Sequence, residues 1–216
     1  MADLELSQQI LDRAALAGAA VPADLAARLV AYLELLRRWN RTINLTALPL
    51  EPATDEAIDR LIVEPIVAAA HLRPGDHLVI DIGSGGGSPA IPMKLAAPSS
   101  QFVLVEAKTR KAAFLRAAVQ ELQLAGVTIE NCRAEEFAAR HAPVHMADVL
   151  TLRAVRVDEM MEATVVALLK PAGRFFWFGG PIEGPSTFGA RPVESRHQTL
   201  LPGVGITVVN ILGGSI

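Results

Sequence analysis

The segment Val79-Ile-Asp-Ile-Gly-Ser-Gly-Gly-Gly-Ser-Pro89 decides the fold of this chain. Its apolar start predicts a buried strand, and its end predicts the first turn of a helix. Gly83, Gly85 and Gly87 stand at alternate positions, where backbone without Cβ atoms can approach a ligand beside a helix N-terminus. This stretch, residues 83–88, is called the glycine loop below. It predicts a ligand site, and the alternative is a tight strand-to-helix turn without one.

Two carboxylates accompany the glycine loop. Asp81 precedes it by two residues and could hold a ligand ammonium group, directly or through a water molecule. Glu106 ends the apolar run Phe-Val-Leu-Val-Glu about 20 residues later, where a carboxylate accepts both hydroxyls of a ribose. A dinucleotide fingerprint needs Gly or Ala at position 88, so Ser88 disfavours an NAD-dependent oxidoreductase.

The chain changes its pattern near residues 71–76, where Pro and Gly interrupt it. Before this point, apolar residues at helical spacing predict helices over 4–16, from Pro22 through Trp39, and over 54–70. After it, apolar runs alternate with helical segments, which indicates βαβ units and a parallel sheet covered on both faces. We therefore predict a helical region over 1–72 and an α/β domain over 73–216.

The individual elements of the second region follow from the same patterns. The predicted strands cover 77–82, 101–106, 127–132, 146–152 and 174–178, and the predicted helices cover 89–97, 109–123, 134–140 and 157–169. Two last stretches, 191–200 and 205–212, suggest a closing antiparallel hairpin.

The composition excludes several classes of protein. With 216 residues, of which 51% are apolar and 20% charged, the chain is globular and needs no disulfide or metal to fold. Cys132 is its single cysteine, which excludes an internal disulfide and a thiolate zinc cluster, and the histidine spacing predicts no metal site. An acidic start and no apolar run of about 18 residues predict a cytoplasmic protein without a membrane partner.

Five segments together resemble one protein family. They are DIGSGGGSPAIP at 81–92, LVEAKTRKAAFL at 104–115, RAEE at 133–136, LRAV at 152–155 and WNRTINLT at 39–46. In this order they resemble the bacterial small-subunit ribosomal RNA guanine-N7 methyltransferases, the glucose-inhibited division protein B family, over roughly residues 30–156.

The resemblance implies a fold, a reaction and partners. It implies a Rossmann-like class I S-adenosylmethionine-dependent fold with a mainly parallel seven-stranded sheet, and methyl transfer to N7 of a guanine in 16S rRNA. The cofactor would be S-adenosylmethionine, and the partner 16S rRNA or the small ribosomal subunit. We expect the protein to be a monomer.

The resemblance also assigns site residues. Gly83 and Ser88 would line the cofactor loop, Glu106 would hold the ribose, and Ala134 and Glu135 would hold the adenine. Arg153 would match an arginine that the family keeps at the end of the fourth strand, and we take it as the catalytic candidate. The chain departs from the family at Leu61, Ser88, Ala90 and Phe178, where His, an aromatic or Leu, Gly and Lys are usual.

Guanine N7 carries a lone pair and no proton, so positioning and electrostatics suffice and a general base is not needed. In agreement, the fourth strand ends in Thr-Leu-Arg-Ala and lacks the Asn/Asp-Pro-Pro-aromatic motif of amino-group methyltransferases. Arg153 could contact the cofactor carboxylate or the base O6, or it could pair structurally with Asp148 or Glu135.

Basic side chains provide the candidates for RNA contact, although the net charge of −3 argues against general polyanion binding. The candidates are Lys108, Arg110, Lys111, Arg116, Arg37, Arg38 and Arg41, and a solvated surface is the alternative for all of them. Trp39 is expected in the core, and Asn40 is expected to bridge its helix to the next loop.

Two other functions stay open. The acidic charge favours an S-adenosylmethionine-dependent methyltransferase of small molecules. The departures at Leu61 and Phe178 favour a non-catalytic nucleotide-binding module for ribosome assembly.

Overall fold

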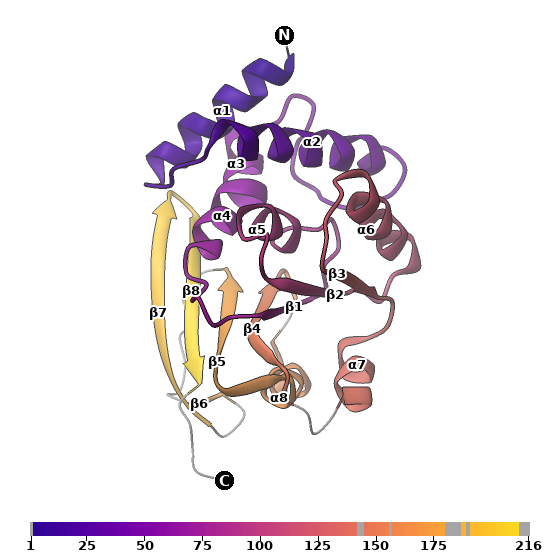
Figure 1. The fold of residues 1–216 in the computed structure, drawn as a ribbon, viewed down its shortest axis with the longest axis vertical. Coiled ribbons are helices and arrows are strands. Elements are labelled where there is room, and N and C mark those ends of the chain that lie inside the picture. The colour runs from indigo at the N-terminus through magenta and orange to yellow at the C-terminus, as the bar shows by residue number, and fades with distance from the viewer. Residues whose placement is uncertain (1, 142–144, 156, 180–186, 189–190, 212–216) are drawn as a thin grey trace.

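The computed structural model describes residues 2–141, 145–155, 157–179, 187–188 and 191–211. Within these ranges the strands form one sheet in the order β3-β2-β1-β4-β5-β8-β7-β6 (Figure 1). The strands are β1 (Leu78–Ile82), β2 (Gln101–Val105), β3 (Val127–Glu130), β4 (Ala147–Arg153), β5 (Leu169–Phe178), β6 (Thr187–Phe188), β7 (Arg191–Leu201) and β8 (Val204–Ile211).

The sheet is mainly parallel, as predicted. Strands β1 to β5 run parallel to one another, and β8 is antiparallel to both β5 and β7. The expected closing hairpin is therefore present, with Leu212 outside the described residues. The seven main strands confirm the predicted sheet, and the two-residue β6 adds a short strand beside β7.

The strand order places a crevice at the carboxyl edge of the sheet. From β1 the chain moves outward to β2 and β3, and then returns to the other side of β1 with β4. The connections that follow β1 and β4 therefore diverge, and ligands of open α/β sheets bind at such a switch point. The glycine loop follows β1, and Arg153 ends β4.

The helices match the predicted segments. They are α1 (Ala2–Leu16), α2 (Ala23–Asn40), α3 (Asp55–Ile58), η1 (Asp59–Val63), α4 (Glu64–Ala69), α5 (Ala90–Ala96), α6 (Thr109–Glu121), α7 (Ala134–His141) and α8 (Glu159–Leu168). Elements α3, η1 and α4 form the helix predicted over 54–70, which Thr54 caps by accepting a 3.2 Å hydrogen bond from Ala57 N. Its central turn, η1, is a π-helix, a form often found at functional sites.

Helices lie on both sides of the sheet (Figure 1), and neighbouring residues of a strand belong to different hydrophobic cores. Val79 and Phe102 pack with the helices of residues 1–72 and with α5 and α6, in one hydrophobic core that also holds Tyr32 and Leu36. Ile80 belongs to a second core that α7 and α8 cover. The strands are therefore buried on both faces. On one of these faces, the N-terminal helices pack directly on the sheet. Among the described helices, none combines the length and apolar character that a membrane crossing requires.

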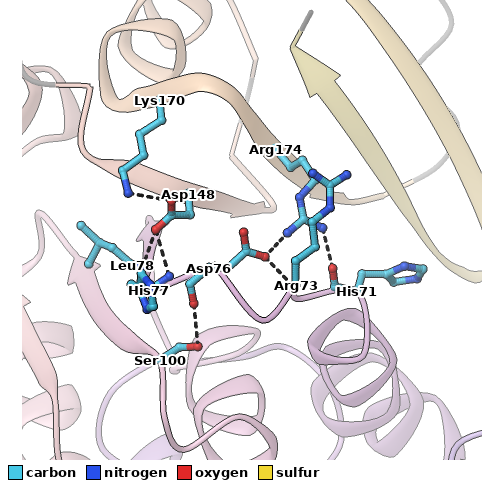
Figure 2. A network of polar contacts seen from close by, with 9 residues as sticks. All are labelled: His71, Arg73, Asp76, His77, Leu78, Ser100, Asp148, Lys170 and Arg174. Carbon is cyan, nitrogen blue, oxygen red and sulfur yellow. Dashed lines mark hydrogen bonds and ion pairs between the residues drawn. The ribbon is translucent and has the colours of Figure 1, made fainter.

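A polar network holds the segment that joins the N-terminal helices to β1, at the amino edge of the sheet (Figure 2). Asp148 accepts hydrogen bonds from the main-chain N–H groups of His77 and Leu78, at 3.0 and 2.9 Å, and from Lys170 Nζ at 2.6 Å. Nearby, the buried Arg174 forms an ion pair with Asp76. This network lies at the opposite edge from the glycine loop.

Candidate active site

A cleft of about 440 Å³ opens at the carboxyl edge of the sheet, a volume within the range of small-molecule sites. Its walls come from the N-terminal helices and their loops, the glycine loop, helix α6 and the ends of β4 and β5. The lining residues are Leu36, Leu45, Thr46, Ala47, Leu48, Arg60, Leu61, Gly83, Ser84, Gly85, Gly86, Ser88, Lys111, Arg153, Ala154, Val155, Trp177 and Phe178. Four of the predicted site residues, Gly83, Gly85, Ser88 and Arg153, therefore share one cleft.

Three residues of the glycine loop have positive φ angles, and at two of them a Cβ would also clash with a neighbouring side chain. Gly83 has a φ of +73°, and a Cβ there would lie 2.7 Å from Val155 Cγ2. Gly87 has a φ of +86°, and a Cβ there would lie 2.5 Å from Ile91 Cδ1, so this residue packs on α5 and does not line the cleft. At Gly85, with a φ of +50°, the nearest atom of another side chain is Lys111 Nζ at 3.8 Å, so this position faces the cleft.

Glu106 lies behind the glycine loop and fixes it. Its carboxylate is buried and accepts main-chain hydrogen bonds from Gly85 N at 2.8 Å and Lys108 N at 2.7 Å. Each oxygen keeps a second lone pair, which leaves acceptor capacity for hydroxyl groups. Asn131 Nδ2 donates to the main-chain carbonyl of Glu106, which ties the end of β2 to the residue after β3.

Asp81 lies beneath the loop and is only 1% exposed. Thr151 Oγ1 donates to its Oδ1 at 2.5 Å, whereas its Oδ2 has no hydrogen-bond partner among the described residues. Burial raises the pKa of Asp81 to about 6, against the opposing effect of the Thr151 hydrogen bond. Asp81 does not line the cleft, so a ligand ammonium group would have to reach the unpartnered oxygen.

Arg153 points into the cleft from the end of β4. Its Nη2 lies 2.8 Å from Glu64 Oε2, and its guanidinium carbon lies 4.6 Å from the centre of the Phe178 ring. The structural alternative, an ion pair with Asp148 or Glu135, is not found, because Asp148 Oδ1 pairs with Lys170 Nζ and Glu135 Oε1 lies 3.7 Å from Arg133 Nη1. Burial lowers the pKa of Arg153, and the charge of Glu64 opposes this shift.

The two residues predicted to hold adenine lie outside this cleft. Ala134 is buried at the start of α7, and Glu135 is exposed beside it. They follow β3, whose end Asn131 joins to Glu106, so they share the carboxyl edge of the sheet but not the lining. Ser88, in contrast, does line the cleft, and its hydroxyl donates to the carbonyl of Leu61 in η1 at 3.0 Å.

The cleft residues that the sequence analysis missed come mainly from the N-terminal helices and the loop after α2. Leu36, Leu48 and Arg60 line the cleft, as does Trp177 at the end of β5. The family-like segment at 39–46 could have indicated this wall of the cleft. As expected, Asn40 bridges its helix to the next loop. Asn40 Oδ1 accepts from the N–H groups of residues 45 and 46 at 2.8 and 3.0 Å.

The basic candidates for RNA contact fall into two groups. Arg37, Arg38 and Arg41 form ion pairs with Glu34, Glu121 and Glu51, respectively. Those on and just before α6 form no ion pair with any described residue, and they are Lys108, Arg110, Lys111 and Arg116. Lys111 also lines the cleft. In the described ranges, no group of three or more His, Cys, Asp or Glu residues could hold a metal ion.

Solved structures of other proteins share the fold. A putative O-methyltransferase from Klebsiella pneumoniae has a TM-score of 0.58 at 15% identity, covering 86% of this chain and 90% of the other. A putative transferase from Pyrococcus horikoshii has a TM-score of 0.56 at 17% identity, covering 70% of this chain and 63% of the other. At these identities the likeness shows the fold alone.

Sequence relatives show the family. The chain is 38% identical to a ribosomal RNA small subunit methyltransferase G of Stenotrophomonas maltophilia over 162 residues, which cover 73% of this chain and 70% of the relative. It is also 38% identical to the protein of that name from Neisseria gonorrhoeae, covering 69% of this chain and 67% of the relative. The family model of GidB, rRNA small subunit methyltransferase G, matches residues 25–183. The chain therefore belongs to the GidB family of rRNA small subunit methyltransferases.

Proposed function

We propose that this protein transfers a methyl group from S-adenosylmethionine to N7 of a guanine in 16S rRNA of the small ribosomal subunit. The observation that carries the proposal is one cleft wall built from the glycine loop and Arg153 in a chain of this family. The two features lie at the carboxyl ends of adjacent parallel strands, β1 and β4, at the switch point of the sheet.

The residues present fit the cofactor. S-adenosylmethionine carries an ammonium group, a carboxylate and a ribose, and the structure offers a group of suitable chemistry for each. The unpartnered Oδ2 of Asp81 would accept from the ammonium, Arg153 would donate to the carboxylate, and Glu106 would accept from the ribose hydroxyls. Gly83, Gly85, Gly87 and Ser88 would form the loop that the cofactor lies against, and Ala134 and Glu135 would bound the adenine.

The chain's own residues would position the reactants. When bound, S-adenosylmethionine supplies a sulfonium methyl group that the N7 lone pair can accept without a base. The apolar lining, including Leu36, Leu48 and Phe178, would exclude water from the cleft. Arg153 would orient the cofactor carboxylate or the guanine O6 through its planar donors. The methylated guanine gains positive charge, so a cation in the wall needs a counter-charge, which Glu64 provides.

RNA would approach over helix α6. Exposed cations without an acidic partner attract phosphates more strongly than cations already paired, because paired ones have a competing anion beside them. By this criterion the exposed Lys108, Arg110 and Arg116, together with the half-buried Lys111, are better candidates than Arg37, Arg38 and Arg41. We place this monomeric enzyme in the cytoplasm, where its ribosomal substrate is found.

Binding and transfer experiments test this proposal. Calorimetry should show binding of S-adenosylhomocysteine and none of NAD. Tritium from labelled S-adenosylmethionine should enter small subunits or deproteinised 16S rRNA in the presence of the protein. Binding without transfer to either RNA substrate would favour the small-molecule methyltransferase or the non-catalytic module.

A further inference from the structure

Glu64 is a buried carboxylate that no sequence motif singled out. It lies in α4, just after the π-helical turn η1, and is 4% exposed. Its Oε1 accepts a hydrogen bond from Gly205 N at 2.8 Å, and its Oε2 lies 2.8 Å from Arg153 Nη2. One side chain therefore joins the helical layer to β8 and to the end of β4.

Burial makes this pair sensitive to the loss of either partner. Desolvation raises the pKa of Glu64 and lowers that of Arg153, and each charge opposes the shift of the other. Without Glu64, Arg153, whose side chain is only 16% exposed, would be a largely desolvated cation without a described carboxylate partner, which is unfavourable. The guanidinium would then turn toward solvent or toward another acceptor.

The ion pair with Glu64 also helps to fix the orientation of the Arg153 guanidinium group. Glu64 holds one terminal nitrogen, and Phe178 lies against the guanidinium at 4.6 Å, so two contacts define the plane of the group. In that plane Arg153 Nε and Nη2 are both buried, and neither has a hydrogen-bond partner among the described residues; the contact of Nη2 with Glu64 is an ion pair. A donor held in place without a partner is a donor available to a ligand.

We propose that Glu64 is a positioning residue, which holds the Arg153 guanidinium in the cleft wall and balances its charge. Its donors then face the reacting groups in one orientation, and the charge of Arg153 itself is balanced beside the methylated, positively charged guanine. The catalytic part of this inference rests on the proposed function. The orientation of Arg153 does not, and it can be measured in the free protein.

The structure offers a matched control at the other edge of the sheet. Asp76 and Arg174 form a second carboxylate–guanidinium pair, in which Arg174 is buried and the Asp76 side chain is 10% exposed, and this pair likewise joins a preceding segment to a strand (Figure 2). That pair belongs to the network around His71 and Asp148 and does not line the cleft. Replacing either carboxylate by its amide removes one charge from a buried pair, but only one of the two changes affects Arg153.

The experiment compares Glu64→Gln, Glu64→Asp and Asp76→Asn with the unmodified protein. Glutamine can still accept from Gly205 N with its carbonyl, but its NH₂ group would face the guanidinium, donor against donor. We expect the Arg153 Nε–Hε resonance in ¹⁵N NMR, assigned by its loss in Arg153→Lys, to shift or broaden in Glu64→Gln and to stay unchanged in Asp76→Asn. Glu64→Asp should restore it in part, because the charge is retained on a shorter side chain.

Methyl transfer gives the second measurement. Glu64→Gln should lower kcat by about 10–100-fold with a much smaller change in KM for RNA, as expected when orientation is lost. Asp76→Asn should lower thermal stability but leave kcat within about twofold, a change that corresponds to under 0.5 kcal/mol.

The outcomes separate the two ideas. An unchanged Arg153 resonance in Glu64→Gln, or equal losses of kcat in Glu64→Gln and Asp76→Asn, would overturn the positioning role. Absence of RNA methylation by the unmodified protein would refute the proposed function, while the NMR comparison would still decide whether Glu64 holds Arg153.

Discussion

The hydroxyl of Tyr32 donates a 2.7 Å hydrogen bond to the main-chain carbonyl of Gly86 and so joins α2 to the glycine loop. Tyr32 is fully buried, and burial raises the pKa of its phenol far above the usual value, so the hydroxyl stays protonated. Beside it, a Cβ at Gly86 would lie 3.2 Å from Leu36 Cδ1 and 3.3 Å from the carbonyl of Leu45. The N-terminal helices therefore shape the loop that we assign to the cofactor.

Tyr32→Phe tests this support. Loss of the hydroxyl leaves the Gly86 carbonyl without its partner, so the free energy of unfolding should fall by about 1–3 kcal/mol. The dissociation constant of S-adenosylhomocysteine should rise several-fold, because the loop becomes less well ordered. Calorimetry and chemical denaturation measure the two effects. Thr164→Val is the control, since it removes a 2.8 Å hydroxyl bond to the Met160 carbonyl in α8 and should affect stability alone.

Gly83→Ala should abolish measurable binding of S-adenosylhomocysteine. The residue has a φ of +73°, and the new Cβ would meet Val155 Cγ2 at 2.7 Å, so the loop must move. Gly203→Ala is the matched control, because Gly203 has the same φ of +73° with nothing within 4 Å. Both changes should cost about 1–2 kcal/mol of backbone strain. Equal binding by the two variants would remove Gly83 from the cofactor site.

Asp81 should make stability fall as pH rises. Its folded pKa of about 6 lies above the ordinary value of 3.8, so the native state binds more protons than the unfolded state between these values. The stability that the protonated Asp81 contributes to the native state is therefore lost as the pH rises from about 4 to 6. Asp81→Asn should raise the free energy of unfolding at pH 7.5 by about 1–3 kcal/mol relative to the unmodified protein, and by much less at pH 4.5.

The same carboxyl group should make ligand binding depend on pH. If Asp81 holds the ligand ammonium, its ionised form binds more strongly, so affinity for S-adenosylhomocysteine should increase between pH 5 and 7. In Asp81→Asn this increase should disappear and the affinity at pH 7 should be lower. A variant that binds as well as the unmodified protein at both pH values would show that the ammonium lies elsewhere.

The cations of α6 should determine the salt dependence of RNA binding. Arg110 and Arg116 are exposed and have no ion-pair partner among the described residues, so each phosphate contact they make releases counterions. Replacing both by Gln should reduce the slope of log K against log salt concentration by about 1.5–2. Arg41→Gln should change it little, since Arg41 already pairs with Glu51. Equal slopes in all variants would place the RNA on another face.

Much of the fold was predictable because its signals are local. Strand β1 and helix α6 follow from apolar runs and helical spacing, and their observed bounds differ from the predicted ones by one or two residues. Strand β5 was predicted from residue 174 but begins at Leu169, because Lys-Pro-Ala-Gly at 170–173 has the composition of a turn. Its pairing of Leu169 with Ala147 includes a register shift that no local pattern encodes.

The site was only partly predictable. The glycine loop is contiguous in sequence, so its position after β1 could be inferred. Glu64 could not, because its partner Arg153 is distant in the chain and only the packing of α4 on the sheet brings them together. Asp148, one of the two structural partners considered for Arg153, cannot reach it for a geometric reason. Five residues along a strand at about 3.3 Å each place it roughly 16 Å from Arg153, at the other edge of the sheet. The division at residues 72 and 73 stays a prediction.

The central claim is best tested by mapping N7-methylguanosine in 16S rRNA from cells that carry the gene, cells that lack it and cells that carry Arg153→Ala. We expect one guanine that is methylated only with the unmodified gene and is largely unmethylated with Arg153→Ala, whose turnover should fall by about 100-fold. An identical pattern of N7-methylguanosine in the first two strains would show that this protein does not methylate N7 of a guanine in 16S rRNA.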